Sequence, residues 1–153
     1  MHGVRSRLAA LVGTALLATA LSVVPAPPAG SVAAAATDGV THGCLSSVPE
    51  PGSSAKVKIC YTLFRPAGAS ARHKVPMLLH SHGWTGSRVT KASQVQGFLD
   101  AGYGVFSFDQ RGWGESGGFA HVENPSYEGA DVRRIVRFIS GLSWVQMDGP
   151  GDP

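Results

Sequence analysis

The chain has 153 residues, with 13 Lys and Arg against 10 Asp and Glu, for a formal net charge of +3 at pH 7. A nucleic-acid-binding protein gathers many basic side chains on one face or helix, whereas this chain has a single small basic cluster. We interpret that cluster, Arg133, Arg134 and Arg137, as the solvated side of a helix. The charge pattern therefore predicts no nucleic-acid partner.

Residues 1–36 have the three regions of a secretory signal peptide. Arg5 and Arg7 stand without an acid, residues 8–24 are apolar, and residues 33–36 are alanines at which cleavage is expected. An uncleaved membrane anchor is the alternative, but prolines follow the apolar run, which is shorter than the roughly 20 residues of a span. We therefore expect a secreted protein, extracellular or in the cell envelope, with no stable membrane span.

Residues 37–55 are rich in Gly, Ser and Pro and are interpreted as an irregular lead-in. They contain Cys44, and the other cysteine, Cys60, follows in the next segment. In an exported protein the two thiols are expected to form a disulfide, which ties the lead-in to the first strand. A pair of unreactive thiols is the alternative.

The next segments predict two strands of different kinds. Residues 56–64 alternate, with Val57, Ile59, Tyr61 and Leu63 on one face and Lys58, Cys60 and Thr62 on the other, which is typical of a half-buried strand. Residues 75–79 are almost continuously apolar, as expected of a strand covered on both faces in a parallel sheet.

The rest of the chain continues the alternation of helix and strand. Residues 93–101 predict a helix, with Val95, Phe98 and Leu99 on one side and Gly102 as its end. Residues 105–108 predict a strand. Residues 128–139 predict an amphipathic helix, whose apolar stripe consists of Val132, Ile135, Val136 and Ile139. This order is that of a doubly wound α/β layer over residues 56–153.

Two polar, glycine-rich turns follow the predicted strands at 75–79 and 105–108. The first is Ser81-His82-Gly83-Trp84-Thr85-Gly86 and the second is Asp109-Gln110-Arg111-Gly112-Trp113-Gly114-Glu115-Ser116. Ligands of α/β proteins bind at the carboxyl ends of the strands, so these turns are the candidate site.

These two motifs, in this order and at this distance, resemble the amino-terminal half of an α/β-hydrolase. The similarity is to the Xaa-Pro dipeptidyl-peptidase and cocaine-esterase-like group, and covers roughly residues 56–153, including Trp144-Val145-Gln146-Met147-Asp148. The resemblance implies the fold class: an α/β, doubly wound hydrolase sheet, truncated before its nucleophile elbow. It also implies a serine hydrolase that cleaves an ester or a peptide or amide bond through an acyl-enzyme.

The resemblance assigns roles to the first turn. The N–H of Trp84 would be one backbone donor of the oxyanion hole, Gly83 would let the chain approach the substrate, and His82 would belong to the same oxyanion loop. Relatives often place a tyrosine hydroxyl in this role, and Trp84 departs from that pattern. The indole of Trp84 would wall the acyl pocket.

The second turn resembles a structural brace. Asp109 and Arg111 are expected to fix loops near the site. Ser116 is not expected to be the nucleophile, because it lacks the elbow, a G-x-S-x-G on a sharp strand-to-helix turn, which we expect to be absent from residues 1–153. The catalytic serine, acid and histidine are then expected beyond Pro153, so that residues 37–153 alone would be inactive. In the usual hydrolase strand order, truncation would also leave the apolar strand at 75–79 without a neighbour, so residues 37–153 alone are expected to be prone to aggregate.

Other interpretations remain. A secreted, non-catalytic binding module could use Trp84, Trp113 and the glycine turns. A metal-dependent hydrolase could use His80 and His82, although no third ligand has a recognisable spacing, and we favour a structural role for both histidines.

Two further patterns are discounted. His121 is expected to be a surface histidine. Residues 112–117 match a dinucleotide-binding fingerprint, but no helix is predicted at its third glycine. We therefore predict no cofactor and no metal, and a small-molecule ester or peptide as the substrate.

Overall fold

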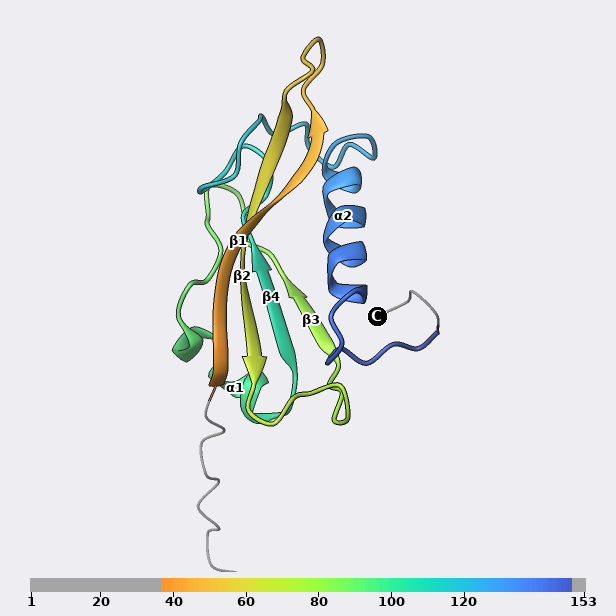
Figure 1. The fold of residues 1–153 in the computed structure, drawn as a ribbon. Helices are drawn as coiled ribbons and strands as arrows, with labels where there is room; N and C mark the ends of the chain where they lie inside the picture. The colour runs from red at the N-terminus through yellow and green to blue at the C-terminus, as the bar shows by residue number, and fades with distance from the viewer. Residues whose placement is uncertain (1–36, 150–153) are drawn as a thin grey trace, which may run out of the picture. The chain divides into compact units, whose positions relative to one another are not determined.

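The computed structural model describes residues 37–149, which contain one mixed sheet with helices on both faces (Figure 1). Its strands are β1 (Thr37–Pro49), β2 (Lys56–Pro66), β3 (Met77–His80) and β4 (Gly104–Phe108). The helices are a 3-10 turn, η1 (Ala92–Gln94), and the α-helices α1 (Gln96–Asp100) and α2 (Glu128–Ser140). The strands lie in the order β1-β2-β4-β3, with β1 and β4 antiparallel to β2 and with β3 parallel to β4.

The prediction that residues 37–55 are irregular is wrong, because residues 37–49 form the long strand β1. The segment has no apolar periodicity and is rich in Gly and Ser, so its strand is imposed by pairing with β2. Gly43 is required there, since a Cβ at this position would lie 2.7 Å from the hydroxyl of Tyr61.

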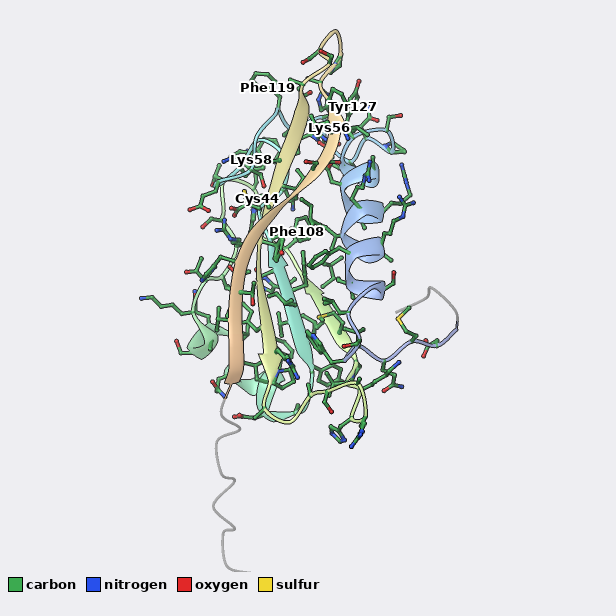
Figure 2. The ribbon with its side chains drawn as sticks, in the orientation of Figure 1. Cys44, Lys56, Lys58, Phe108, Phe119 and Tyr127 are labelled. Atoms are coloured by element: carbon green, nitrogen blue, oxygen red, sulfur yellow. A yellow bond between two sulfur atoms is a disulfide. The ribbon has the colours of Figure 1, made fainter. Side chains whose placement is uncertain are left out.

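The predicted disulfide is confirmed. Cys44 on β1 stands directly opposite Cys60 on β2, and the two sulfur atoms are bonded. Figure 2 shows Cys44 near the middle of β1. The bond ties the edge strand to the centre of the sheet.

Strand β2 is more deeply buried than predicted, because both of its faces are covered. Ile59, Tyr61 and Leu63 pack on the side of α2, while Phe64 packs on the side of α1. The polar face is covered as well, and Thr62 is fully buried. The alternation predicts one buried and one solvent-exposed face, but loops after β3 and β4 cover the second face.

Strand β3 is shorter and less covered than predicted. It begins at Met77, and Leu79 is 40% exposed. Val75, which was expected within the strand, instead forms an isolated parallel bridge with Val145. Within residues 37–149, β3 is an edge strand, paired only with β4.

Two apolar clusters lie on the two faces of the sheet. The larger is built from β2, β4 and α2 and contains the stacked rings of Tyr61 and Phe106, whose centroids are 4.7 Å apart. The smaller packs Val95 and Leu99 against Phe64 and Val105. This arrangement of helices on both faces of a sheet is the predicted doubly wound α/β layer.

The helices match their predictions in position but not in every side chain. Gly102, with φ of 85°, follows α1 as its predicted end. Phe98 and Val132, which were predicted to face the core, are 44% and 38% exposed. The basic side chains of α2 are exposed, as predicted.

Reduction of the Cys44–Cys60 disulfide is expected to lower the free energy of unfolding by about 3 kcal/mol, because the bond closes a short loop in the unfolded chain. Urea denaturation of the oxidised and reduced protein measures the difference. A Cys44→Ser/Cys60→Ser variant should match the reduced protein. Equal stability of the oxidised and reduced forms would contradict the expectation.

Candidate functional site

The two turns singled out in the sequence lie side by side at one end of the sheet. The first follows β3 and the second follows β4, and these strands are parallel neighbours. Their carboxyl ends therefore meet at the same edge, where α/β proteins bind ligands. We call residues 81–91 the oxyanion loop, after the role that the resemblance predicts for it, and residues 109–118 the brace turn.

Trp84 lies at the exposed tip of the oxyanion loop. The N–H of Gly86 donates to the carbonyl of Gly83 at 3.0 Å, so Trp84 and Thr85 are the central residues of a turn. Thr85 has a φ of 64°, which is typical of the third residue of a type II turn. Within residues 37–149, the Trp84 N–H has no hydrogen-bond partner and belongs to no helix or ladder.

The indole of Trp84 meets a second indole from the brace turn. It packs edge to face on Trp113, with the ring centroids 4.9 Å apart, and remains 69% exposed. The space beside the Cα atom of Gly83 is empty, since a Cβ there would contact nothing within 4 Å. The free N–H and the open glycine therefore stand beside an apolar wall.

His82 connects the oxyanion loop to the end of β4. Its Nε2 accepts a hydrogen bond from the N–H of Gln110 at 3.1 Å, and its Nδ1 lies 2.8 Å from the carbonyl of Gly83. Gln110 adds two bonds from its side-chain amide, to Ser81 Oγ at 2.8 Å and to the carbonyl of His82 at 3.0 Å. Gln110 was missed in the sequence, where only its place after Asp109 hinted at a role.

Asp109 is the buried centre of the brace turn, as predicted. Its carboxylate is fully buried, pairs with the guanidinium of Arg88, and accepts the N–H of Arg88 at 2.6 Å and of Glu115 at 2.9 Å. Burial would lower the pKa of Arg88, but Glu115 and Asp109 raise it on balance. Gly114 leaves the room for this carboxylate, because a Cβ at Gly114 would overlap it.

Arg88, which the sequence did not single out, fixes the far end of the oxyanion loop. Besides Asp109, it reaches Thr62 on β2 through Nε at 3.2 Å and Glu115 through Nη2 at 2.6 Å. The next residue, Val89, donates its N–H to Ser107 on β4 at 3.1 Å. The loop is thus held to neighbouring strands on both sides of its tip.

Arg111 is the second brace, also as predicted. It is buried and donates two hydrogen bonds, of 2.8 and 2.9 Å, to the carboxylate of Asp131 at the start of α2. It also donates to Glu50 at 2.9 Å and to the carbonyl of Val48 at 3.0 Å. Burial would lower the pKa of Arg111, but the hydrogen bonds and charges of Asp131 and Glu50 raise it on balance. The turn is therefore tied to β1 and α2 together.

His121 belongs to this second brace and is not simply a surface histidine. Its Nε2 lies 2.5 Å from Glu50, and its ring stacks on Tyr127 at 4.1 Å. Figure 2 shows Tyr127 and Phe119 beside the end of the hairpin that β1 and β2 form. The loop before α2 is therefore attached to that hairpin.

The side chain of Ser116 has a structural role, because it links the brace turn to β2. Its hydroxyl donates to the carbonyl of Asp109 and accepts the N–H of Cys60, both at 2.8 Å. The expectation that residues 1–153 lack the elbow pattern needs a correction, because residues 114–118 do read G-x-S-x-G. They form no elbow, since no helix follows before Glu128. The dinucleotide-like match at 112–117 lacks its helix for the same reason.

His80, the other histidine considered as a metal ligand, also has a hydrogen-bond partner within the sheet. His80 Nδ1 lies 3.0 Å from Ser107 Oγ. Among the described residues, no group of three or more His, Cys, Asp or Glu side chains is placed to hold a metal ion. In the same part of the chain, no helix is long and apolar enough to cross a membrane.

A cleft of about 300 Å³ opens beside the oxyanion loop. It lies between the carboxyl ends of the strands and the start of α2, and its lining includes Ser81, Phe108, Gln110, Arg111, Asp131 and Val132. A smaller cleft of about 140 Å³ adjoins it, with Trp84 and Trp113 in its wall. The two turns therefore border concave space, as a binding site requires.

The family model of the X-Pro dipeptidyl-peptidase (S15 family) matches residues 55–147, which is more than half of the chain. The chain belongs to this family. With its sheet order and flanking helices, the described part has the α/β-hydrolase fold in part. The family is named after a peptidase, and peptidases are hydrolases.

Solved structures are similar to this chain at low identity. A hypothetical protein from Pseudomonas aeruginosa is 20% identical with a TM-score of 0.50, over 71% of this chain and 33% of its own. An esterase from Pyrococcus furiosus is 18% identical (TM-score 0.48), over 82% and 42%. Acetyl xylan esterase 1 from Thermoanaerobacterium is 15% identical (TM-score 0.47), over 69% and 41%.

The chain thus spans between a third and just over two fifths of the length of these three structures. Among curated proteins, no match was found.

Asp109→Asn is expected to lower the free energy of unfolding by about 3 kcal/mol, because it leaves the buried Arg88 without its buried partner. Glu115→Gln is the matched control. It removes the other carboxylate, which is 71% exposed, and should cost less than about 1 kcal/mol. Chemical denaturation measures both, and equal losses would contradict the role of Asp109.

The brace around Glu50 predicts a loss of stability in acid. Burial would raise the pKa of Glu50, but hydrogen bonds from His121, the Phe119 N–H and Arg111 lower it from 4.5 to about 2. This contribution is complete above pH 4.5 and is lost as the pH falls from 4.5 towards 2.

Glu50→Gln should remove that part of the pH dependence. Denaturation of both proteins across this window measures it. An equal loss of stability in the wild type and in Glu50→Gln would contradict the assignment.

Proposed function

We propose that this S15 chain is the amino-terminal part of a secreted serine hydrolase that cleaves an ester or a peptide or amide bond through an acyl-enzyme. The observation that carries the proposal is the N–H of Trp84, which has no partner among residues 37–149 and lies at the tip of a braced loop beside two clefts. Acyl transfer needs such a donor aimed at the place where negative charge develops on the attacked carbonyl oxygen.

The loop supplies what this role demands of a backbone donor. Gly83 leaves space for the substrate, and the bonds from Gln110 to His82 hold the backbone that leads to the tip. A donor fixed in advance stabilises the charge without reorganising during the reaction. Trp84 would thus contribute its amide to the oxyanion and its indole to the acyl pocket.

The attacking group would come from outside residues 1–153. Ser116 is the one serine within an elbow-like sequence, and its hydroxyl is engaged at both ends. We propose that the catalytic serine, acid and histidine lie beyond Pro153. Residues 37–153 alone would then lack hydrolase activity.

A specific observation favours a rival function, a secreted module that binds without catalysis. Three apolar side chains are unusually exposed, namely Trp84, Phe119 and Val122, with 69, 72 and 70% of their surfaces free. Trp84 and Val122 line the same small cleft, and exposed apolar groups that lie together often mark an interaction surface. The two proposals differ in whether a reactive serine exists in the protein.

The first test is to read the coding sequence beyond Pro153 and to treat the resulting protein with a serine-reactive fluorophosphonate. The hydrolase proposal predicts a G-x-S-x-G within about a strand's length of Pro153 and covalent labelling of its serine. A stable protein that ends at Pro153, or one that does not react, would support the binding module instead.

A substitution at Trp84 separates the roles of amide and indole. Trp84→Ala keeps the backbone N–H, whereas Trp84→Pro removes it. Proline is favoured at the second residue of this type of turn, so the turn should survive. We expect Trp84→Pro to react about 100-fold more slowly with the fluorophosphonate than Trp84→Ala.

The circular dichroism of the two variants should match, as a control for folding. Equal labelling rates in Trp84→Pro and Trp84→Ala would place the oxyanion donor elsewhere.

A further inference from the structure

The two hydrogen-bond partners of His82 select one tautomer of its neutral imidazole. The carbonyl of Gly83 can only accept a hydrogen bond, so Nδ1, 2.8 Å away, must carry a proton. The backbone N–H of Gln110 can only donate, so Nε2, 3.1 Å away, must be free of one. The geometry thus selects the neutral imidazole with its proton on Nδ1.

The ring is also the link between the oxyanion loop and the main chain after β4. His82 precedes Trp84 by two residues, and its Nε2 receives the Gln110 N–H. The same Gln110 binds the carbonyl of His82 through its side chain. Movement of the ring away from Gln110 would therefore release the backbone that leads to the Trp84 amide.

Protonation would oppose this contact. A second proton on Nε2 would point at the N–H of Gln110, so an attraction would become a repulsion. The charged groups of the two loops packed against the ring are engaged elsewhere. Arg88 pairs with Asp109 and Glu115, and Arg111 pairs with Glu50 and Asp131. Within residues 37–149, no carboxylate hydrogen-bonds to His82 to stabilise its charge.

We infer that His82 is a positioning residue of the hydrolase, whose neutral imidazole holds the oxyanion loop against the end of β4 and whose protonation releases the loop and slows turnover. This inference rests on the proposed function. It assigns to His82 a role in the acid side of the pH profile, in addition to that of the catalytic histidine. Histidine is suited to such a role because its charge changes between about pH 5 and 8.

A pair of substitutions tests the role of each ring nitrogen in the protein expressed from its whole reading frame. His82→Asn keeps a donor near the position of Nδ1 but loses the acceptor for Gln110. His82→Gln places an amide oxygen near Nε2, which accepts the same bond and does not titrate. On p-nitrophenyl acetate at about pH 8, we expect His82→Asn to lower kcat about tenfold with little change in KM, and His82→Gln to recover most of that loss.

The pH profile of kcat distinguishes positioning from a merely structural role. If protonation of His82 releases the loop, the acid limb of log kcat in the wild type should drop by about one unit below that of His82→Gln, because the lost contact costs about tenfold, as in His82→Asn. His73→Gln, at an exposed turn away from the site, is the control and should keep the wild-type profile. Superimposable acid limbs in the wild type and His82→Gln would overturn the inference.

Nitrogen-15 NMR of the histidine side chains gives a readout that needs no activity. The His82 signals are identified by their loss in His82→Gln. We expect a protonated Nδ1 and an unprotonated Nε2 at neutral pH, and the reverse tautomer would overturn the inference. If the protein hydrolyses nothing and resists the fluorophosphonate while the tautomer is as expected, the proposed function fails and the structural role of His82 stands.

Discussion

The buried carboxylate of Asp109 is the constraint on which the site depends. It accepts the main-chain N–H groups of Arg88 and Glu115, pairs with the Arg88 guanidinium, and lies on a residue whose own N–H bonds to Cys60 of β2. One residue thus joins the central strand, the loop after β3 and the turn after β4. A buried carboxylate is tolerated only when it is fully paired, so these groups have little freedom to separate.

The second network, around Arg111, and the disulfide extend this constraint to the edges of the sheet. Arg111 binds α2 through Asp131 and the β1–β2 hairpin through Glu50, while Cys44 fastens β1 to β2. The result is a rigid frame around an exposed loop tip. Rigid scaffolds that present backbone groups on loops are the usual way in which α/β proteins build binding and catalytic sites.

The sequence was sufficient for the parts of the fold that have local signals. Apolar runs and helical periodicity predicted β2, β4 and α2, and the glycine-rich turns after strands located the site. Strand β1 was missed because its sequence has no apolar period and its ladder depends on residues of β2. Arg88, Gln110 and Glu50 were missed because their partners lie 21 to 71 residues away in the chain, and contacts at such separation leave no periodic pattern. The glycines at 43 and 114 are explained only by the side chains that occupy the space beside them.

In the proposed hydrolase, the amide of Trp84 faces the oxyanion. A crystal structure of the protein from its whole reading frame, with a fluorophosphonate bound to its serine, tests this directly. We predict a phosphonyl oxygen within about 2.7–3.1 Å of the Trp84 nitrogen, with the oxyanion loop still bonded to Gln110. An adduct whose phosphonyl oxygen is bound by other donors, with the Trp84 N–H turned away to solvent, would contradict it.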